Sequence, residues 1–103
     1  MAKIVFQGIN SDERQLILSG MQRRVLGSQK MWCEIDNERG LIEFTVHKSE
    51  VPAEYQARTI DMVMTDFCNT VGLGSFMSRC YINHEDRLEH FVEAIENNET
   101  FDF

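Results

Sequence analysis

Two alternating segments joined by a short turn constrain the fold of this chain more than any other feature. Residues 31–36, MWCEID, and 41–48, LIEFTVHK, flank Asn37–Gly40, whose final Gly can take the positive φ that such a turn requires. Every second residue from Ile42 to Val46 is apolar, so these side chains share one face. The pattern predicts a β-hairpin with one buried face.

The segment before this hairpin predicts a strand and then a helix. Residues 3–9, KIVFQGI, are rich in β-branched and aromatic types. Asn10 or Ser11 can cap a helix that we expect to run to about Leu26. The buried side of this helix would repeat every four residues, at Ile17, Met21 and Val25.

The segment after the hairpin predicts a helix, a strand and a last helix. Pro52 suits the first position of a helix over 52–71. Its apolar stripe is Ile60, Val63, Met64, Phe67 and Val71. Residues 76–82, FMSRCYI, alternate and predict a strand, and Asn83 can cap the last helix. The apolar stripe of that helix is Leu88, Phe91, Val92 and Ile95.

The resulting order predicts one α+β domain over residues 1–103, with a core over 1–83 and an acidic helix and tail over 84–103. The β-α-β-β-α-β order is that of the ferredoxin-like split βαβ arrangement, an antiparallel sheet with two helices on one face. The opposite face would show apolar residues that are unusual to leave in water. Either the last helix folds back over that face or its rim, or a dimer buries both.

Charge is distributed unevenly along the chain. The net charge is −7. Residues 1–30 carry five basic and two acidic residues, whereas residues 31–103 carry five basic and fifteen acidic residues. Non-specific binding of nucleic acid depends on neutralising phosphates, so this acidic balance argues against direct nucleic-acid contact.

Composition also bears on location. No apolar run approaches the roughly 20 residues of a membrane helix, and the first residues lack the pattern of a signal peptide. Cys33, Cys68 and Cys80 form no CxxC motif, and we expect reduced, mostly buried thiols. These features predict a cytoplasmic protein without a membrane contact.

The last helix carries an unusual stripe of acidic residues. At about 100° per residue, five carboxylates fall together beside its apolar stripe. They are Glu85, Asp86, Glu89, Glu93 and Glu96. Like charges four residues apart repel, and Glu93 and Glu96 also lie near the negative end of the helix dipole. The stripe is either a solvated face that keeps the protein soluble, a docking surface for a basic protein site, or a contact with the basic first helix of a second copy.

The tail adds two aromatic residues. Phe101 and Phe103 either pack against the domain or anchor a partner.

Catalytic and metal chemistry find little support in the residues. His47, His84 and His90 lack the four-residue spacing of a helical zinc site, and Cys68 has acidic rather than basic neighbours. We therefore expect no catalytic residue, no metal and no cofactor.

Two families share the expected strand order. The first strand resembles that of RNA recognition motifs, but Leu41 and Glu43 occupy positions where that family presents stacking aromatics. FQGI, residues 6–9, is similar to the VQGV-like stretch of acylphosphatases, whose following loop holds phosphate with an Arg. Here Asp12 and Glu13 precede Arg14, which falls late in the loop.

The sequence therefore predicts a small, acidic, non-enzymatic binding or inhibitor protein, of the kind that phages and mobile elements encode. It would dock on a basic, nucleic-acid-binding surface of a protein partner through the acidic stripe, Phe101 and Phe103. The alternative is a homodimeric regulatory or ligand-binding domain of ferredoxin-like fold. A minor alternative is an acylphosphatase-like hydrolase that depends on Arg14.

Overall fold

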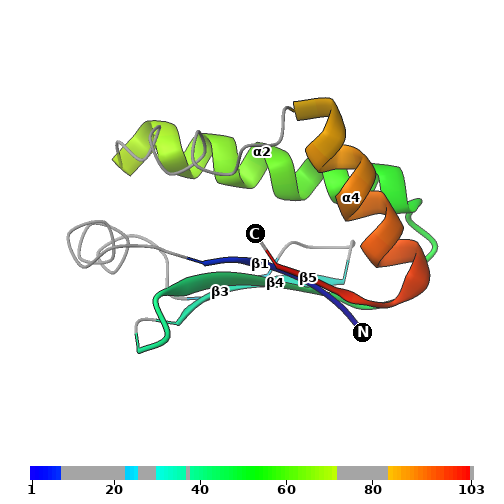
Figure 1. Ribbon diagram of the computed structural model, residues 1–103, viewed down its shortest axis with the longest axis horizontal. Coiled ribbons are helices and arrows are strands. Elements are labelled where there is room, and N and C mark those ends of the chain that lie inside the picture. Colours follow the sequence, from blue (N-terminus) through cyan, green and yellow to red (C-terminus); the bar gives the residue numbers. More distant parts are fainter. Residues whose placement is uncertain (8–22, 26–29, 37, 72–83, 103) are drawn as a thin grey trace.

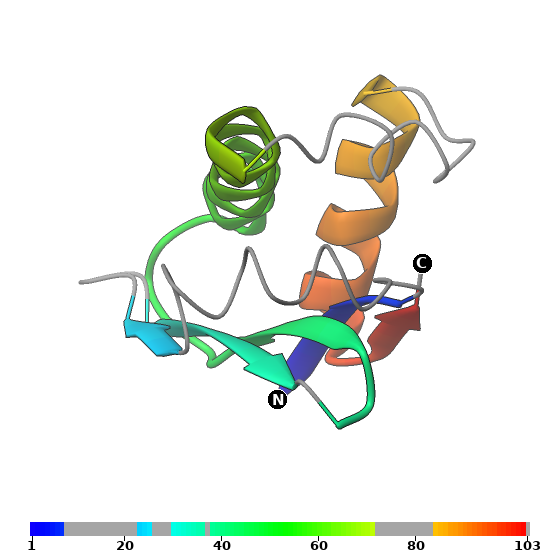
Figure 2. The same cartoon turned by 90° about the vertical axis from the view of Figure 1, so that its left-hand side faces the viewer.

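The described part of the chain forms one mixed sheet with two helices packed on one of its faces (Figures 1 and 2). The computed structural model describes residues 1–7, 23–25, 30–36, 38–71 and 84–102, with the backbone alone at 23–25, 66–71 and 84. In chain order the elements are β1 (Ala2–Phe6), β2 (Arg23–Val25), β3 (Met31–Asp36), β4 (Leu41–Val46), α2 (Ala53–Val71), α4 (His84–Asn97) and β5 (Thr100–Asp102). The protein is thus of the α+β class, as the sequence predicts.

The strand order in the sheet is β2-β3-β4-β1-β5. Neighbouring strands run antiparallel except β1 and β5, which are parallel. The ferredoxin-like order is not confirmed. That order would place the strand expected at 76–82 beside β1, but β5 pairs with β1 along Lys3–Val5. Residues 76–82 themselves lie outside the described part.

The hairpin prediction is confirmed. β3 and β4 pair from Met31↔Val46 to Asp36↔Leu41. Gly40 has φ of 65°, and the Asp36 carboxylate accepts a hydrogen bond of 2.9 Å from the Arg39 N–H within the turn. A residue with a Cβ would be disfavoured at that positive φ, which explains why Gly closes the turn.

The prediction that the first helix reaches about Leu26 is wrong. Arg23–Val25 form a strand that pairs with β3, with Val25 opposite Trp32. The free edge of β3 has backbone donors and acceptors to satisfy, and a three-residue strand satisfies them. The match of Val25 to a four-residue apolar repeat is a weaker determinant of local structure than the need to pair the backbone of this edge. The remainder of the expected helix lies outside the described residues.

The second predicted helix is confirmed as α2, which begins one residue after Pro52. The Pro52 carbonyl accepts hydrogen bonds from the N–H groups of Tyr55 and Gln56, at 3.0 and 3.2 Å. Ile60, Val63 and Met64 are buried, as their spacing predicts. For Phe67 and Val71 the structure describes the backbone alone.

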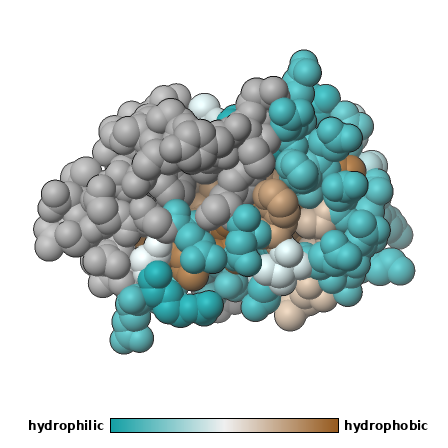
Figure 3. Space-filling view, in the orientation of Figure 1, coloured by the Kyte–Doolittle hydropathy of each residue, from teal (hydrophilic) through white to brown (hydrophobic). Residues whose placement is uncertain are grey.

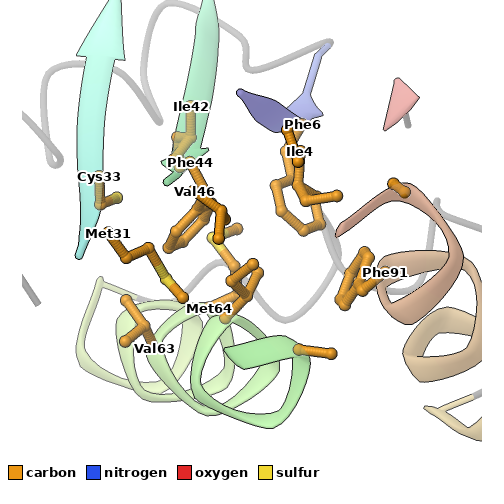
Figure 4. Close-up of a cluster of buried hydrophobic side chains, with 14 residues drawn as sticks. Ile4, Phe6, Met31, Cys33, Ile42, Phe44, Val46, Val63, Met64 and Phe91 are labelled. Carbon is orange, nitrogen blue, oxygen red and sulfur yellow. The ribbon is translucent and has the colours of Figure 1, made fainter. Parts of the chain in front are cut away.

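The core lies between the sheet and the two helices (Figure 4). Phe6 is its centre, because its ring packs edge to face on both Phe44 and Phe91, with centroids 6.0 and 5.9 Å apart. The three rings come from β1, β4 and α4, so these contacts join the helix layer to the sheet. Alternate residues of β4, Ile42, Phe44 and Val46, are buried on this face as predicted.

The last helix was expected over the opposite face or the rim of the sheet, and it lies instead on the same face as α2 (Figures 1 and 2). Phe91 and Ala94 enter the shared core, which explains this position. On the opposite face Val5 and Leu41 are each only 5% exposed, and half-buried Trp32 packs edge to face on His47.

The end of α4 leads directly into β5. Asn98 has φ of 57°, its N–H donates to the Ile95 carbonyl, and the Glu99 N–H donates to the Ala94 carbonyl. These are the two bonds of a Schellman motif, which ends a helix with a residue in left-handed conformation. The Glu99 carbonyl then accepts from the Lys3 N–H at 3.0 Å, which starts the pairing with β1.

Candidate partner-binding surface

Helix α4 presents the acidic stripe on a rigid support. Phe91 and Ala94 are buried in the core, and Leu88, Val92 and Ile95 are half-buried against it. One side of the helix is therefore fixed by packing, and the adjacent side is left to solvent.

An ion pair between the helices also fixes α4. Arg87 Nε lies 3.2 Å from Asp61 Oδ1 of α2, and the two side chains are only 13% and 9% exposed. Sequence reasoning missed this pair. A signal was present, because Asp61 lies between Ile60 and Val63 of the apolar stripe of α2, and a carboxylate there needs a partner.

All five residues of the acidic stripe are exposed, and we call them the acidic face of α4. They are Glu85, Asp86, Glu89, Glu93 and Glu96. Hydrophilic side chains gather over the end of the molecule where α4 lies (Figure 3). The structure thus brings together the five carboxylates that the sequence predicted as one surface.

Little positive charge opposes this surface. Among the described residues, no Lys or Arg lies within ion-pair distance of Glu85, Glu89 or Glu96. Glu93 has only His90, whose Nδ1 lies 4.0 Å from its carboxylate. Arg87 is the single basic residue of the segment 83–103, and it points to Asp61 instead. Within the described part of the chain, the carboxylates of Glu85, Glu89 and Glu96 are therefore left for solvent or a partner.

The helix dipole stabilises negative charge at the start of α4 and destabilises it at the end. Glu85 and Asp86 lie in the first turn, where the helix dipole favours negative charge. No basic residue lies in the last turn, where Glu96 is found. A carboxylate there opposes the dipole, so helix stability does not account for Glu96.

Of the two aromatic residues of the tail, Phe101 packs on the domain. Phe101 belongs to β5, is half-buried against the core, and stacks on the His90 ring with centroids 4.9 Å apart and planes 11° apart. This arrangement matches the expectation that the tail packs on the domain. Phe103 lies outside the described residues.

A second acidic group lies on the hairpin, around a shallow hollow of about 300 Å³. Glu34 and Glu43 face each other across β3 and β4. Lys3 Nζ lies 3.5 Å from Glu43, and Arg39 lies 3.7 Å from Asp36. Because its own cations balance this group in part, it is a weaker candidate than the acidic face of α4.

Other chemistry is sparse in the part of the chain that the structure describes. No group of three or more His, Cys, Asp or Glu side chains there could hold a metal ion. Cys33 is a buried thiol, and the side chains of Cys68, Cys80 and His84 are outside the description. Arg14 and the loop similar to that of acylphosphatases are outside it as well.

Neither described helix is long and apolar enough to cross a membrane. In comparisons with known proteins, no family model matches the chain, and no curated protein and no solved structure matches it either.

Proposed function

We propose that this chain is a small, non-enzymatic, cytoplasmic binding protein that docks through the acidic face of α4 on a basic surface of another protein. The observation that carries the proposal is that Glu85, Glu89 and Glu96 are exposed on a packed helix without a described Lys or Arg beside them. Exposed carboxylates without a described basic partner suit an external cation, and Glu96 in addition opposes the helix dipole.

The geometry favours a partner that normally binds nucleic acid. Glu85, Glu89 and Glu93 follow one another at a rise of about 6 Å along the helix axis. A regular row of negative groups can take the place of backbone phosphates in a groove lined by Lys and Arg. The chain would then inhibit the partner by occupying that groove.

Rigidity supports the same proposal. The backbone of α4 is held by the buried Phe91 and by the Arg87–Asp61 ion pair. A surface that is ordered before binding loses less conformational entropy on association than a mobile acidic tail would lose.

Replacement of charge on the acidic face tests the proposal. The wild-type chain should capture a partner from an extract of its host, and the bound protein, identified by mass spectrometry, should be released by added salt. The triple variant Glu85→Gln, Glu89→Gln, Glu93→Gln should capture at least about tenfold less, since several charge contacts are lost together.

A matched variant controls for net charge. Glu38→Gln, Glu50→Gln, Glu54→Gln removes three exposed carboxylates outside α4 and leaves the same net charge as the first triple variant. It should capture the partner nearly as well as the wild type. Equal losses in the two variants, or capture that salt does not weaken, would refute docking through α4.

Competition separates the nucleic-acid-like mode from other charge contacts. Duplex DNA or RNA should displace the captured partner from the chain, because both would occupy the same groove. If a saturating concentration of either leaves the complex intact, the basic surface involved is not a nucleic-acid groove.

A further inference from the structure

A cavity of about 580 Å³ lies where the end of β4, the start of α2 and the end of α4 come together. These three ends lie close together at one end of the molecule (Figure 1). The volume falls in the range of about 300–1,000 Å³ that is usual for small-molecule sites. The cavity is separate from the hairpin hollow and is bordered by the acidic face of α4 at Glu96 alone.

Apolar and polar residues both line the cavity, and the apolar ones come from several elements. Val46 of β4 is buried, and Val51, Ala53 and Ile95 are half-buried around the opening. These four residues come from β4, the following loop, α2 and α4. Their shared apolar surface suits a short hydrocarbon group, which would remove it from water.

Two opposite charges border the same cavity on different walls. Lys48 follows β4, and Glu96 lies at the end of α4. Within the described residues, neither has an ion-pair partner closer than 4.0 Å, and they do not pair with each other. The helix ends add a second pair of opposite charges at the cavity, because the start of α2 carries a partial positive charge and the end of α4 a partial negative charge.

A pair of polar residues, buried Gln56 and half-buried Ser49, completes the lining. Gln56 is only 3% exposed, and its Nε2 donates to Ser49 Oγ at 3.1 Å. Ser49 Oγ also accepts from the Val51 N–H at 3.2 Å. With two hydrogen bonds accepted, the Ser49 hydroxyl is left as a donor, next in sequence to Lys48.

We infer that this cavity binds a small zwitterion with an apolar side chain, which is the chemistry of an apolar α-amino acid. The carboxylate lies beside Lys48 and the Ser49 hydroxyl, the ammonium lies beside Glu96, and the hydrocarbon contacts Val46 and Ile95. A purely anionic ligand would meet Glu96, and a purely cationic one would meet Lys48. This inference does not depend on the proposed docking function.

Titration with L-leucine, followed by NMR of the 15N-labelled chain, tests the inference. Leucine should bind with a Kd below about 1 mM and shift the resonances of Val46, Ser49, Gln56 and Ile95. Leucinamide lacks the carboxylate and 4-methylpentanoate lacks the ammonium, so each should bind at least about tenfold more weakly. No shift at these residues with leucine, or equal binding of all three compounds, would overturn the zwitterion site.

Variants of the lining provide a second readout. Lys48→Met and Glu96→Gln should each weaken leucine binding about tenfold, since each removes one charge contact. Ala53→Leu should also weaken it, because the larger side chain would occupy part of the cavity. The matched controls Arg58→Met and Glu85→Gln, both at exposed positions that do not line the cavity, should leave the Kd unchanged. Leucine binding that none of the three lining variants weakens in a folded chain would place leucine elsewhere and refute the site.

Discussion

The two arginines at positions 58 and 87 show how burial changes the value of an ion pair. Arg58 and Glu54 lie 2.9 Å apart on the surface of α2, with both side chains more than half exposed. Arg87 and Asp61 lie 3.2 Å apart between α2 and α4, largely out of water. Solvent screens the first pair strongly and the second pair weakly, so only the second is expected to matter for stability.

Replacement of each arginine by methionine tests this difference. Arg87→Met should lower the free energy of unfolding by on the order of 3 kcal/mol, because it removes the guanidinium from a buried carboxylate. Arg58→Met should change it by less than about 1 kcal/mol. Urea unfolding followed by circular dichroism measures both. The double variant Arg87→Met, Asp61→Leu should recover most of the loss, and a double variant as unstable as Arg87→Met alone would contradict this account.

The elements differ in how much of them the sequence could predict. β3, β4 and α2 were predictable, because alternation from Ile42 to Val46 and the spacing of Ile60, Val63 and Met64 are local signals that the core then uses. β2 and β5 were not predictable. Each has three residues, too few for a period, and each exists because a neighbouring strand edge supplies hydrogen bonds.

The side of the sheet that α4 covers was equally hidden from the sequence. Periodicity showed which face of α4 is apolar, but not which apolar surface it would meet. The position of α4 is determined by the contact between Phe91 and Phe6 and by the ion pair between Arg87 and Asp61. Both join residues far apart in the sequence. For the candidate site the reverse holds, since the acidic face depends on spacing within one helix and was predicted residue by residue.

The two ends of α4 offer a paired test of its dipole. Glu96→Lys should raise the free energy of unfolding by about 0.5–1 kcal/mol, because a cation near the last turn is favourable. Glu85→Lys should lower it by a similar or smaller amount, because the first turn favours an anion. Both variants change the net charge equally, so the difference between them isolates the helix ends. Thermal or urea unfolding at low ionic strength measures it.

Salt provides the control for this pair. The difference between the two variants should shrink in about 0.5 M salt, because screening weakens charge–dipole interactions at exposed positions. Two variants that are equally stabilised would show that relief of the net charge outweighs the dipole.

Across the whole molecule, acidic residues outnumber basic ones, so not every carboxylate can have its own basic partner. Lys3, Arg39 and Arg58 each lie near a carboxylate of the sheet or of α2, and Arg87 lies near Asp61. None of these four cations lies within ion-pair distance of Glu85, Glu89 or Glu96. A chain that needed only solubility could spread its charge, so the concentration of exposed carboxylates on one packed helix is what links the fold to the proposed docking function.

Stability and binding should therefore change in opposite directions when this face is neutralised. The variant Glu89→Gln, Glu93→Gln, Glu96→Gln removes repulsion between residues four apart and removes carboxylates from the negative end of α4, while Gln keeps a similar helix propensity. Its free energy of unfolding at low ionic strength should rise by about 1 kcal/mol, and capture of the basic partner should fall at least about tenfold. The control variant Glu38→Gln, Glu50→Gln, Glu54→Gln should change both quantities less. A variant of α4 that is less stable than the wild type would mean that these carboxylates support the fold, and the case for an external cationic partner would then fail.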